Sequence, residues 1–285
     1  LAAGLPLSAH LSARVAPDPA PPPARPHAPA ASTPELRIVG QYGGDVRAVA
    51  VDGDMAVIGV GPRVAVIDLR DPASPRLVGQ TGVLEGTVID LAVRGHLAFA
   101  VAGGLSVVDL SDPTAPVRIG VLDLGEHHPT YGWTGPAHIA AGDGVVVLAG
   151  NSEYGLGRPH VVDVSDPREP ALAARFELYD AIDVAMVADV AWVTREGCWD
   201  GAEGCDETYP AVLGLDVADP ASPRLVGAFA SRDGAGRIAA DGTRVVVTKS
   251  TCALTVIDVS DPNRPREERC GNLFAPDNVQ ANVFD

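Results

Sequence analysis

One seven-residue phrase, V-[IV]-D-[LV]-x-D-P, recurs along this chain and constrains its fold more than any other feature. It occupies residues 66–72, 107–113, 161–167 and 256–262, with a looser copy at 214–220. The Asp-Pro pairs of successive copies are 41, 54, 53 and 42 residues apart. A period of this size indicates a repeat architecture, in which each copy forms one unit that packs on its neighbours.

Each copy predicts four short β-strands. In the first copy, residues 46–51, 55–60, 64–69 and 76–80 are mostly apolar and are separated by turn sequences rich in Gly, Asp and Pro. Helical periodicity is almost absent. Four strands in about 40 residues are typical of a propeller blade, so we expect an all-β protein, a β-propeller with about five full four-stranded blades. The alternatives fit less well, because a β-helix has shorter coils and a sandwich requires no period.

The recurring phrase resembles the LVIVD repeat of bacterial and archaeal cell-surface proteins, and the resemblance covers residues 35–274. It implies propeller blades and a place on the cell surface. It implies little about activity, because most members of that family have no assigned activity. The copy at 214–220 departs from the pattern, with Gly214-Leu215 where two β-branched residues are usual.

Both ends of the repeat region match parts of a blade. Residues 36–41 match the fourth strand at 76–80, and residues 278–285 match the first strand with its flanks at 45–52. These matches predict a lone fourth strand and a lone first strand. We therefore expect five full blades of a longer protein, truncated at its C-terminus.

The sequence divides into a tail and a repeat domain. Residues 1–34 form an Ala/Pro-rich tail, whose composition favours extended conformations and cannot bury a core, and residues 35–285 form the propeller. Residues 1–13 have the apolar character of a signal-peptide remnant but lack its charged start. No stretch of 18 apolar residues predicts a membrane span in this segment. We expect an extracytoplasmic protein, secreted or on the cell surface.

The charge of the chain limits its partners. The formal net charge is −16 at pH 7. We do not expect nucleic acid as a partner, because neutralising its phosphates requires a basic face.

Four cysteines form two candidate disulfides. Cys252 and Cys270 lie nine residues on either side of Asp261, which places them opposite each other on neighbouring strands if no bulge intervenes. Cys198 and Cys205 lie seven residues apart in one loop. Both spacings allow disulfide geometry, and four cysteines allow three pairings. Free or buried thiols are the alternative.

Three insertions interrupt the repeat, at residues 126–136, 151–159 and 196–210. The first joins a fourth strand to the next first strand, and the others join second to third strands. Antiparallel connectivity places all three at one edge of the propeller, where loops on a rigid scaffold commonly bind ligands. Their aromatic and polar residues are the candidate ligand-binding side chains, although such residues also pin long loops to a surface: His127, His128, Tyr131, Trp133, Tyr154, Arg158, Trp199 and Tyr209.

A second candidate set comes from aligning the first strands of the blades. Asp90, His138, Asp183 and Arg237 occupy one equivalent position in consecutive copies, where the first copy has Ala48. The aspartates satisfy backbone donors in one interpretation. In the other, His138, Asp90 and Asp183 bind a divalent cation such as Zn²⁺, and Arg237 binds an anionic ligand. The acidic, Gly-rich residues 200–207 suggest Ca²⁺, or simply a solvated loop.

The function predicted from these features is that of a binding scaffold for a protein or carbohydrate, with the ligand face formed by the inserted loops. A metal-dependent hydrolase or lyase at the channel mouth is the alternative, and a purely structural module is a third. No nucleophile, phosphate-loop or His-Glu-x-x-His motif is present, which favours a protein without catalytic activity.

Overall fold

The computed structural model describes residues 46–124, 127–128, 132–133, 137–150, 158–178, 180–197, 209–231, 233–249 and 253–271. These residues contain five four-stranded antiparallel sheets, here called blades 1 to 5, and a two-stranded ribbon. The predicted all-β fold with five full blades is thereby confirmed. Residues 1–45 lie outside the described part, so the division into tail and propeller stays a prediction.

Each blade is a consecutive meander. Blade 1 has β1 (Val46–Asp52), β2 (Met55–Val60), β3 (Arg63–Asp68) and β4 (Arg76–Gln80). Blade 2 has β5 (Asp90–Arg94), β6 (Leu97–Val101), β7 (Leu105–Asp109) and β8 (Val117–Leu122). Blade 3 has β11 (His138–Ala141), β12 (Val145–Ala149), β13 (His160–Asp163) and β14 (Ala171–Arg175).

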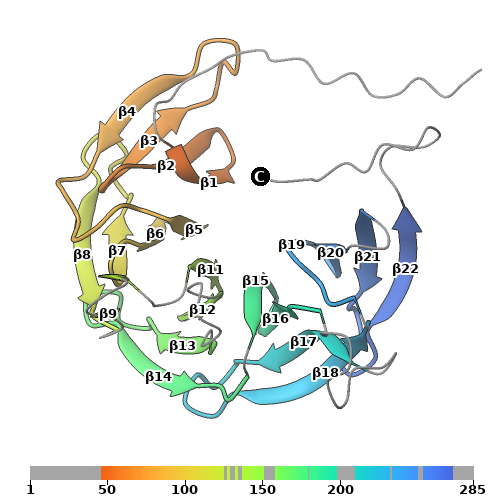
Figure 1. The fold of residues 1–285 in the computed structure, drawn as a ribbon. Coiled ribbons are helices and arrows are strands. Elements are labelled where there is room, and N and C mark those ends of the chain that lie inside the picture. Colours follow the sequence, from red (N-terminus) through yellow and green to blue (C-terminus); the bar gives the residue numbers. More distant parts are fainter. Residues whose placement is uncertain are drawn as a thin grey trace, which may run out of the picture. The chain divides into compact units, whose positions relative to one another are not determined.

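The last two blades follow the same plan. Blade 4 has β15 (Ala181–Val187), β16 (Val190–Arg195), β17 (Pro210–Asp216) and β18 (Arg224–Ala230). Blade 5 has β19 (Ile238–Asp241), β20 (Arg244–Thr248), β21 (Leu254–Asp258) and β22 (Arg266–Gly271). The first strands of successive blades contact one another, and Figure 1 shows these strands on the inside with the fourth strands on the outside.

The recurring phrase builds two successive turns after the third strand of each blade. In blade 2, Asp109 Oδ1 accepts a hydrogen bond from the backbone N–H of Ser111 at 2.8 Å. Three residues later, Asp112 Oδ1 accepts from Thr114 N–H at 2.9 Å, while its carbonyl accepts from Ala115 N–H at 3.0 Å. The same bonds recur in the other blades. Both aspartates of the phrase are therefore turn-forming residues that satisfy backbone donors.

A β-bulge recurs between the third and fourth strands of every blade. In blade 1, Ile67 pairs with Leu77 and Val66 with Gly79, which leaves Val78 as the extra residue. The equivalent bulges lie at Val107/Val108, Val161/Val162, Gly214/Leu215 and Val256/Ile257. A bulge bends the outer strand and increases its twist, which the outermost strand of a wedge-shaped blade requires.

The bulge in blade 5 shifts the register around Cys270, the one of the four cysteines that the structure describes. Cys270 pairs with Thr255, not with a residue placed symmetrically about Asp261. The expected position of Cys252 directly opposite Cys270 holds only for an unbulged hairpin. Cys198, Cys205 and Cys252 lie outside the described residues, so both disulfides stay predictions.

The core lies between neighbouring blades, because the sheets pack face to face on one another. Val57 and Val66 of blade 1 pack in one cluster with Leu91, Ala98 and Val108 of blade 2. Equivalent clusters lie between blades 2 and 3, blades 3 and 4, and blades 4 and 5. The second and third strands of blades 1 to 4 read as nearly continuous apolar runs because both of their faces are covered.

Glycines in the fourth strands allow close contact with the next blade. A Cβ at Gly79 would overlap the backbone carbonyls of Pro113 and Thr114 in the Asp-Pro turn of blade 2. One at Gly120 would overlap the carbonyl of Pro167 in blade 3, and one at Gly227 the carbonyl of Pro262 in blade 5. The outer-strand glycine of one blade and the Asp-Pro turn of the next thus form one contact, which we call the outer seat.

The irregular fourth copy of the phrase is explained by packing. Gly214 pairs with Trp192 across β16 and β17, and a Cβ at Gly214 would come within 2.9 Å of the indole ring. Trp192 is completely buried and belongs to the cluster between blades 4 and 5. Blade 4 therefore has glycine where other copies have valine because it accommodates the largest side chain of that cluster.

Candidate functional site

The three insertions all leave from one edge of the blades, here called the loop edge. The first lies between the end of β8 at Leu122 and the start of β11 at His138. The other two lie between β12 and β13 and between β16 and β17. First and third strands begin at this edge, second and fourth strands end there, and the Asp-Pro turns lie at the opposite, turn edge. The antiparallel topology therefore places the insertions on one side of consecutive blades.

Several predicted ligand-binding residues are outside the structural description. Tyr131, Tyr154 and Trp199 are not described at all. His127, His128 and Trp133 are described only as backbone, in the ribbon of β9 (His127–His128) and β10 (Gly132–Trp133). Trp133 pairs with His127 in that ribbon. The remaining candidates, Arg158, Tyr209 and Arg237, can be placed.

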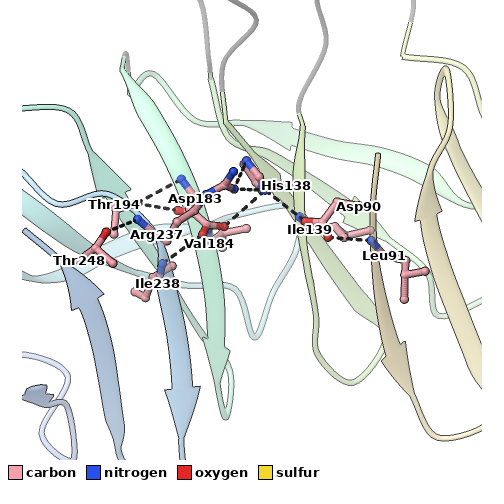
Figure 2. Close-up of polar contacts among 10 residues, drawn as sticks. All are labelled: Asp90, Leu91, His138, Ile139, Asp183, Val184, Thr194, Arg237, Ile238 and Thr248. Carbon is pink, nitrogen blue, oxygen red and sulfur yellow. Dashed lines mark hydrogen bonds and ion pairs between the residues drawn. The ribbon is translucent and has the colours of Figure 1, made fainter. Parts of the chain in front are cut away.

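Four residues predicted to share one position come together at the loop edge, on the inside of the blades. Figure 2 shows Asp90, His138, Asp183 and Arg237 as one polar group, which we call the axial cluster. His138 Nδ1 lies 3.3 Å from Asp90 Oδ2 and 3.8 Å from Asp183 Oδ1. The cluster therefore joins side chains from blades 2, 3, 4 and 5.

The two carboxylates of the axial cluster link neighbouring blades. Asp90 Oδ1 accepts from Leu91 N–H of its own strand at 2.9 Å, and its Oδ2 accepts from Ile139 N–H of blade 3 at 3.1 Å. Asp183 repeats this pattern with Val184 N–H at 2.8 Å and Ile238 N–H of blade 5 at 3.1 Å. Both aspartates thus accept hydrogen bonds from backbone N–H groups, as one of the two interpretations expected. For each aspartate, one of the two donors belongs to the next blade.

Burial distinguishes Asp183 from the aspartates of the turn edge. Its side chain is 12% exposed, and desolvation raises the pKa of its carboxyl group. The positive charges of His138 and Arg237 and the two N–H donors act in the opposite direction but do not cancel that effect. Each oxygen of this buried carboxylate accepts a backbone hydrogen bond, so the side chain has a structural role in joining blades 4 and 5.

Arg237 and His138 form the part of the axial cluster that can contact a ligand. Arg237 is exposed, and its Nη1 lies 2.5 Å from His138 Nε2 and 2.9 Å from Nδ1. The guanidinium of Arg237 can only donate hydrogen bonds, and Nδ1 of the same imidazole ring also faces Asp90 Oδ2 at 3.3 Å.

This arrangement is unfavourable for the predicted cation site. Both ring nitrogens of His138 have partners, the carboxylates bind backbone N–H groups, and the Arg237 guanidinium adds a positive charge. Within the described ranges, no three His, Cys, Asp or Glu side chains form a group that could hold a metal ion. Residues 200–207, suggested for Ca²⁺, are not among those ranges. Zinc or calcium binding stays a prediction.

His160 is a buried structural residue beside the second insertion. It is 2% exposed at the start of β13. Its Nδ1 lies 2.8 Å from the carbonyl of Arg158, to which it donates, and its Nε2 accepts from Arg175 Nε at 3.0 Å. Arg158 in turn pairs with Glu177 at 3.0 Å. His160 and Arg158 therefore fix the chain where the insertion at 151–159 rejoins blade 3.

Two cation–aromatic contacts at the loop edge were not predicted. The guanidinium of Arg195 lies 4.7 Å from the ring centre of Tyr209, at the two ends of the insertion at 196–210. Lys249 Nζ lies 5.6 Å from the ring centre of Phe229, across the boundary between blades 5 and 4. Burial raises the pKa of the Tyr209 hydroxyl. The sequence gives no periodic signal for these pairs, because each joins residues from different strands.

Comparisons with known proteins agree with this architecture. The model of the LVIVD repeat matches residues 43–82, 85–123 and 235–269. No curated protein sequence matches the chain. Among the described residues, no helix has the length and apolar character that crossing a membrane requires.

Solved structures share the fold at low sequence identity. The computationally designed Ika8 protein has a TM-score of 0.54 and 13% identity, over 78% of this chain and 61% of its own. A chain of the nidogen/laminin complex has a TM-score of 0.52 and 13% identity, over 80% of each chain. The Swd1 β-propeller domain from Myceliophteria thermophila has a TM-score of 0.51 and 14% identity, over 81% of this chain and 75% of its own. At these identities the likeness shows the propeller fold alone.

Proposed function

We propose that this chain, three segments of which match the LVIVD repeat, acts as an extracytoplasmic binding scaffold whose ligand face is the loop edge. The observation that carries the proposal is the convergence of the axial cluster and the three insertions on that edge. Rigid blades hold both ends of each insertion, and such loops are where binding residues concentrate in other folds. The turn edge, in contrast, has only short turns whose aspartates bind their own backbone.

The chemistry of the loop edge favours a ligand that carries negative charge. Arg237, Arg195 and Lys249 are cations at this edge of a protein with a net charge of −16. Tyr209 and Phe229 place aromatic rings beside two of them. Aromatic rings next to cationic groups suit the binding of an acidic sugar, through ring stacking and charge-assisted hydrogen bonds. A carbohydrate containing carboxylates is therefore our first choice of ligand.

An array of neutral and acidic oligosaccharides tests this proposal. The labelled wild-type protein should retain acidic glycans, and Arg237→Ala should weaken retention at least tenfold. Arg70→Ala is the matched control, since Arg70 is an exposed arginine at the turn edge and should leave binding unchanged. Replacing residues 196–210 by a short turn should abolish binding while the thermal transition persists. No retained glycan, or equal loss in the Arg70 variant, would contradict the proposal, and protein partners would then be screened.

The extracytoplasmic location is proposed from three features of the sequence. They are the Ala/Pro-rich tail, the two candidate cysteine pairs 198–205 and 252–270, and the family resemblance. Peptide mapping without reduction should find both pairs cross-linked in the protein taken from its native cells. Thiols that react with an alkylating reagent at all four positions would contradict this location.

A further inference from the structure

The connection between blades 4 and 5 crosses the base of the third insertion at very close range. Its last part, residues 233–237, is described, and we call this segment the strap. Gly234 of the strap forms an isolated antiparallel bridge with Glu196, the first residue of that insertion. A Cβ at Gly234 would overlap the backbone N of Gly197, and one at Gly197 would lie 2.5 Å from the carbonyl oxygen of Asp233. The two backbones can therefore touch because both residues are glycine.

Hydrogen bonds fix the strap to its neighbours between this crossing and Arg237. Ala235 N–H donates to the Arg195 carbonyl at 2.9 Å, and Ala235 is 3% exposed. Gly236 N–H donates to the Thr248 carbonyl at 2.9 Å, and Arg237 N–H donates to Thr248 Oγ1 at 2.9 Å. Figure 2 shows the last of these bonds beside the axial cluster. The path of the strap therefore determines where the backbone of Arg237 lies.

The side chain of Arg237 depends on that placement because it spans the inside of a whole blade. Arg237 directly precedes β19 of blade 5, His138 begins β11 of blade 3, and Asp183 has the axial position of blade 4 between them. Arg237 Nη1 nevertheless lies 2.5 Å from His138 Nε2. Arg237 is exposed, and it is the cation of the axial cluster that we expect to contact an acidic ligand. Binding groups of this kind depend on supporting residues that hold them in the productive geometry.

We propose that Gly234 and Gly197 are positioning residues for Arg237, a role that rests on the proposed function of the loop edge. Neither residue has a side chain that could bind a ligand. Their close contact sets the distance between the strap and the base of the insertion, and the strap sets the point from which the Arg237 guanidinium reaches His138. A methyl group at either glycine separates the two backbones, displaces Arg237 and weakens the binding of an acidic ligand.

Alanine variants of the whole chain test this role through the binding of tetragalacturonic acid, an acidic oligosaccharide. Gly234→Ala should weaken binding about fivefold or more, and Gly197→Ala should act in the same direction. Gly242→Ala is the matched control, because Gly242 has a φ of +58°, close to the +68° of Gly234, and a Cβ at Gly242 meets nothing within 4 Å. The control therefore carries similar backbone strain without the overlap, and it should bind like the wild type.

A double-mutant cycle shows whether the glycines act through Arg237. In an Arg237→Ala background, Gly234→Ala should cause no further loss of affinity, because the strap then has no guanidinium to place. Both variants should keep a cooperative thermal transition, and binding is measured well below it. The same fold loss in both backgrounds would overturn the inference, since Gly234 would then act on the fold or on the insertion and not on Arg237.

A measurement without ligand separates this inference from the proposed function. The His138 Cε1–H resonance, assigned with a His138→Ala variant, reports on the guanidinium that contacts the imidazole ring. At one fixed pH, Gly234→Ala should move this resonance toward its position in Arg237→Ala, and Gly242→Ala should leave it in place. If the wild type binds no tetragalacturonic acid but this movement occurs, the proposed ligand is wrong and the positioning role stands. If the resonance does not move in Gly234→Ala, the positioning role is wrong whatever the protein binds.

Discussion

At the scale of single residues, the pair Trp192 and Gly214 shows how one side chain dictates another on the neighbouring strand. The sequence showed that the fourth copy of the phrase was irregular, but not why. The reason became visible only from the register of β16 and β17, which places Gly214 under the indole ring. Cross-strand compensation of this kind leaves no periodic trace in a sequence, since its partners lie 22 positions apart.

Gly214→Val should lower the free energy of unfolding by about 1–3 kcal/mol, because the added methyl groups overlap a fully buried ring. In a Trp192→Val background the same substitution should cost much less, since the ring is gone. Urea denaturation of the wild type, both single variants and the double variant measures this coupling. Additive losses would show that the two residues do not compensate each other.

At the scale of elements, the strands followed from the sequence and the links between blades did not. Alternating turn signals and apolar runs predicted four strands per copy, and the insertions were visible as breaks in the repeat. The sequence also placed Asp90, His138, Asp183 and Arg237 at equivalent positions. It could not assign the second oxygen of each aspartate to an N–H group in the next blade, because that bond joins residues about 50 positions apart.

Asp183→Ala should destabilise the protein by about 2–4 kcal/mol, because Val184 N–H and Ile238 N–H both lose their acceptor in a buried place. Hydrogen exchange should localise the effect, with faster exchange of the Ile238 amide in blade 5. Asp52→Ala, at an exposed carboxylate that ends β1, serves as a comparison for the loss of one negative charge. Equal losses in the two variants would mean that the link between blades contributes nothing.

At the scale of the whole molecule, the repeated aspartates make the free energy of unfolding depend on pH in the acidic range. In every blade, hydrogen bonds lower the pKa of the first aspartate of the phrase. Side-chain donors have the largest effect in blades 1 to 3, where Arg70 donates to Asp68, Ser111 to Asp109 and Ser165 to Asp163. Backbone N–H donors have the largest effect in blades 4 and 5, where Ala218 donates to Asp216 and Ser260 to Asp258. A carboxyl group with a lower pKa in the folded state stabilises that state above its unfolded pKa. The stabilisation disappears as the pH falls toward the folded pKa.

For Asp68 this window is defined, since Arg70 lowers the pKa from 3.8 to about 2. The free energy of unfolding should therefore fall between about pH 4 and pH 2, and Asp68→Asn should make that fall shallower. Asp183 acts in the opposite direction, because its raised pKa means that protonation relieves the cost of a buried charge. Denaturant titrations at closely spaced pH values measure both slopes. A wild type and an Asp68 variant with parallel curves would contradict the assignment.

The outer seat also bears on how repeat units can be added to such a chain by duplication. In three of the four described junctions between blades, a glycine of one blade meets the Asp-Pro turn carbonyl of the next, and each repeat unit of the sequence carries both features. A duplicated repeat unit therefore brings both an outer-strand glycine, which contacts the next blade, and an Asp-Pro turn, which contacts the preceding blade. Blade 3, with Ala174 at the glycine position, shows that one imperfect junction is tolerated. Descendants of one ancestral unit could thus vary in number while their inserted loops diverged independently.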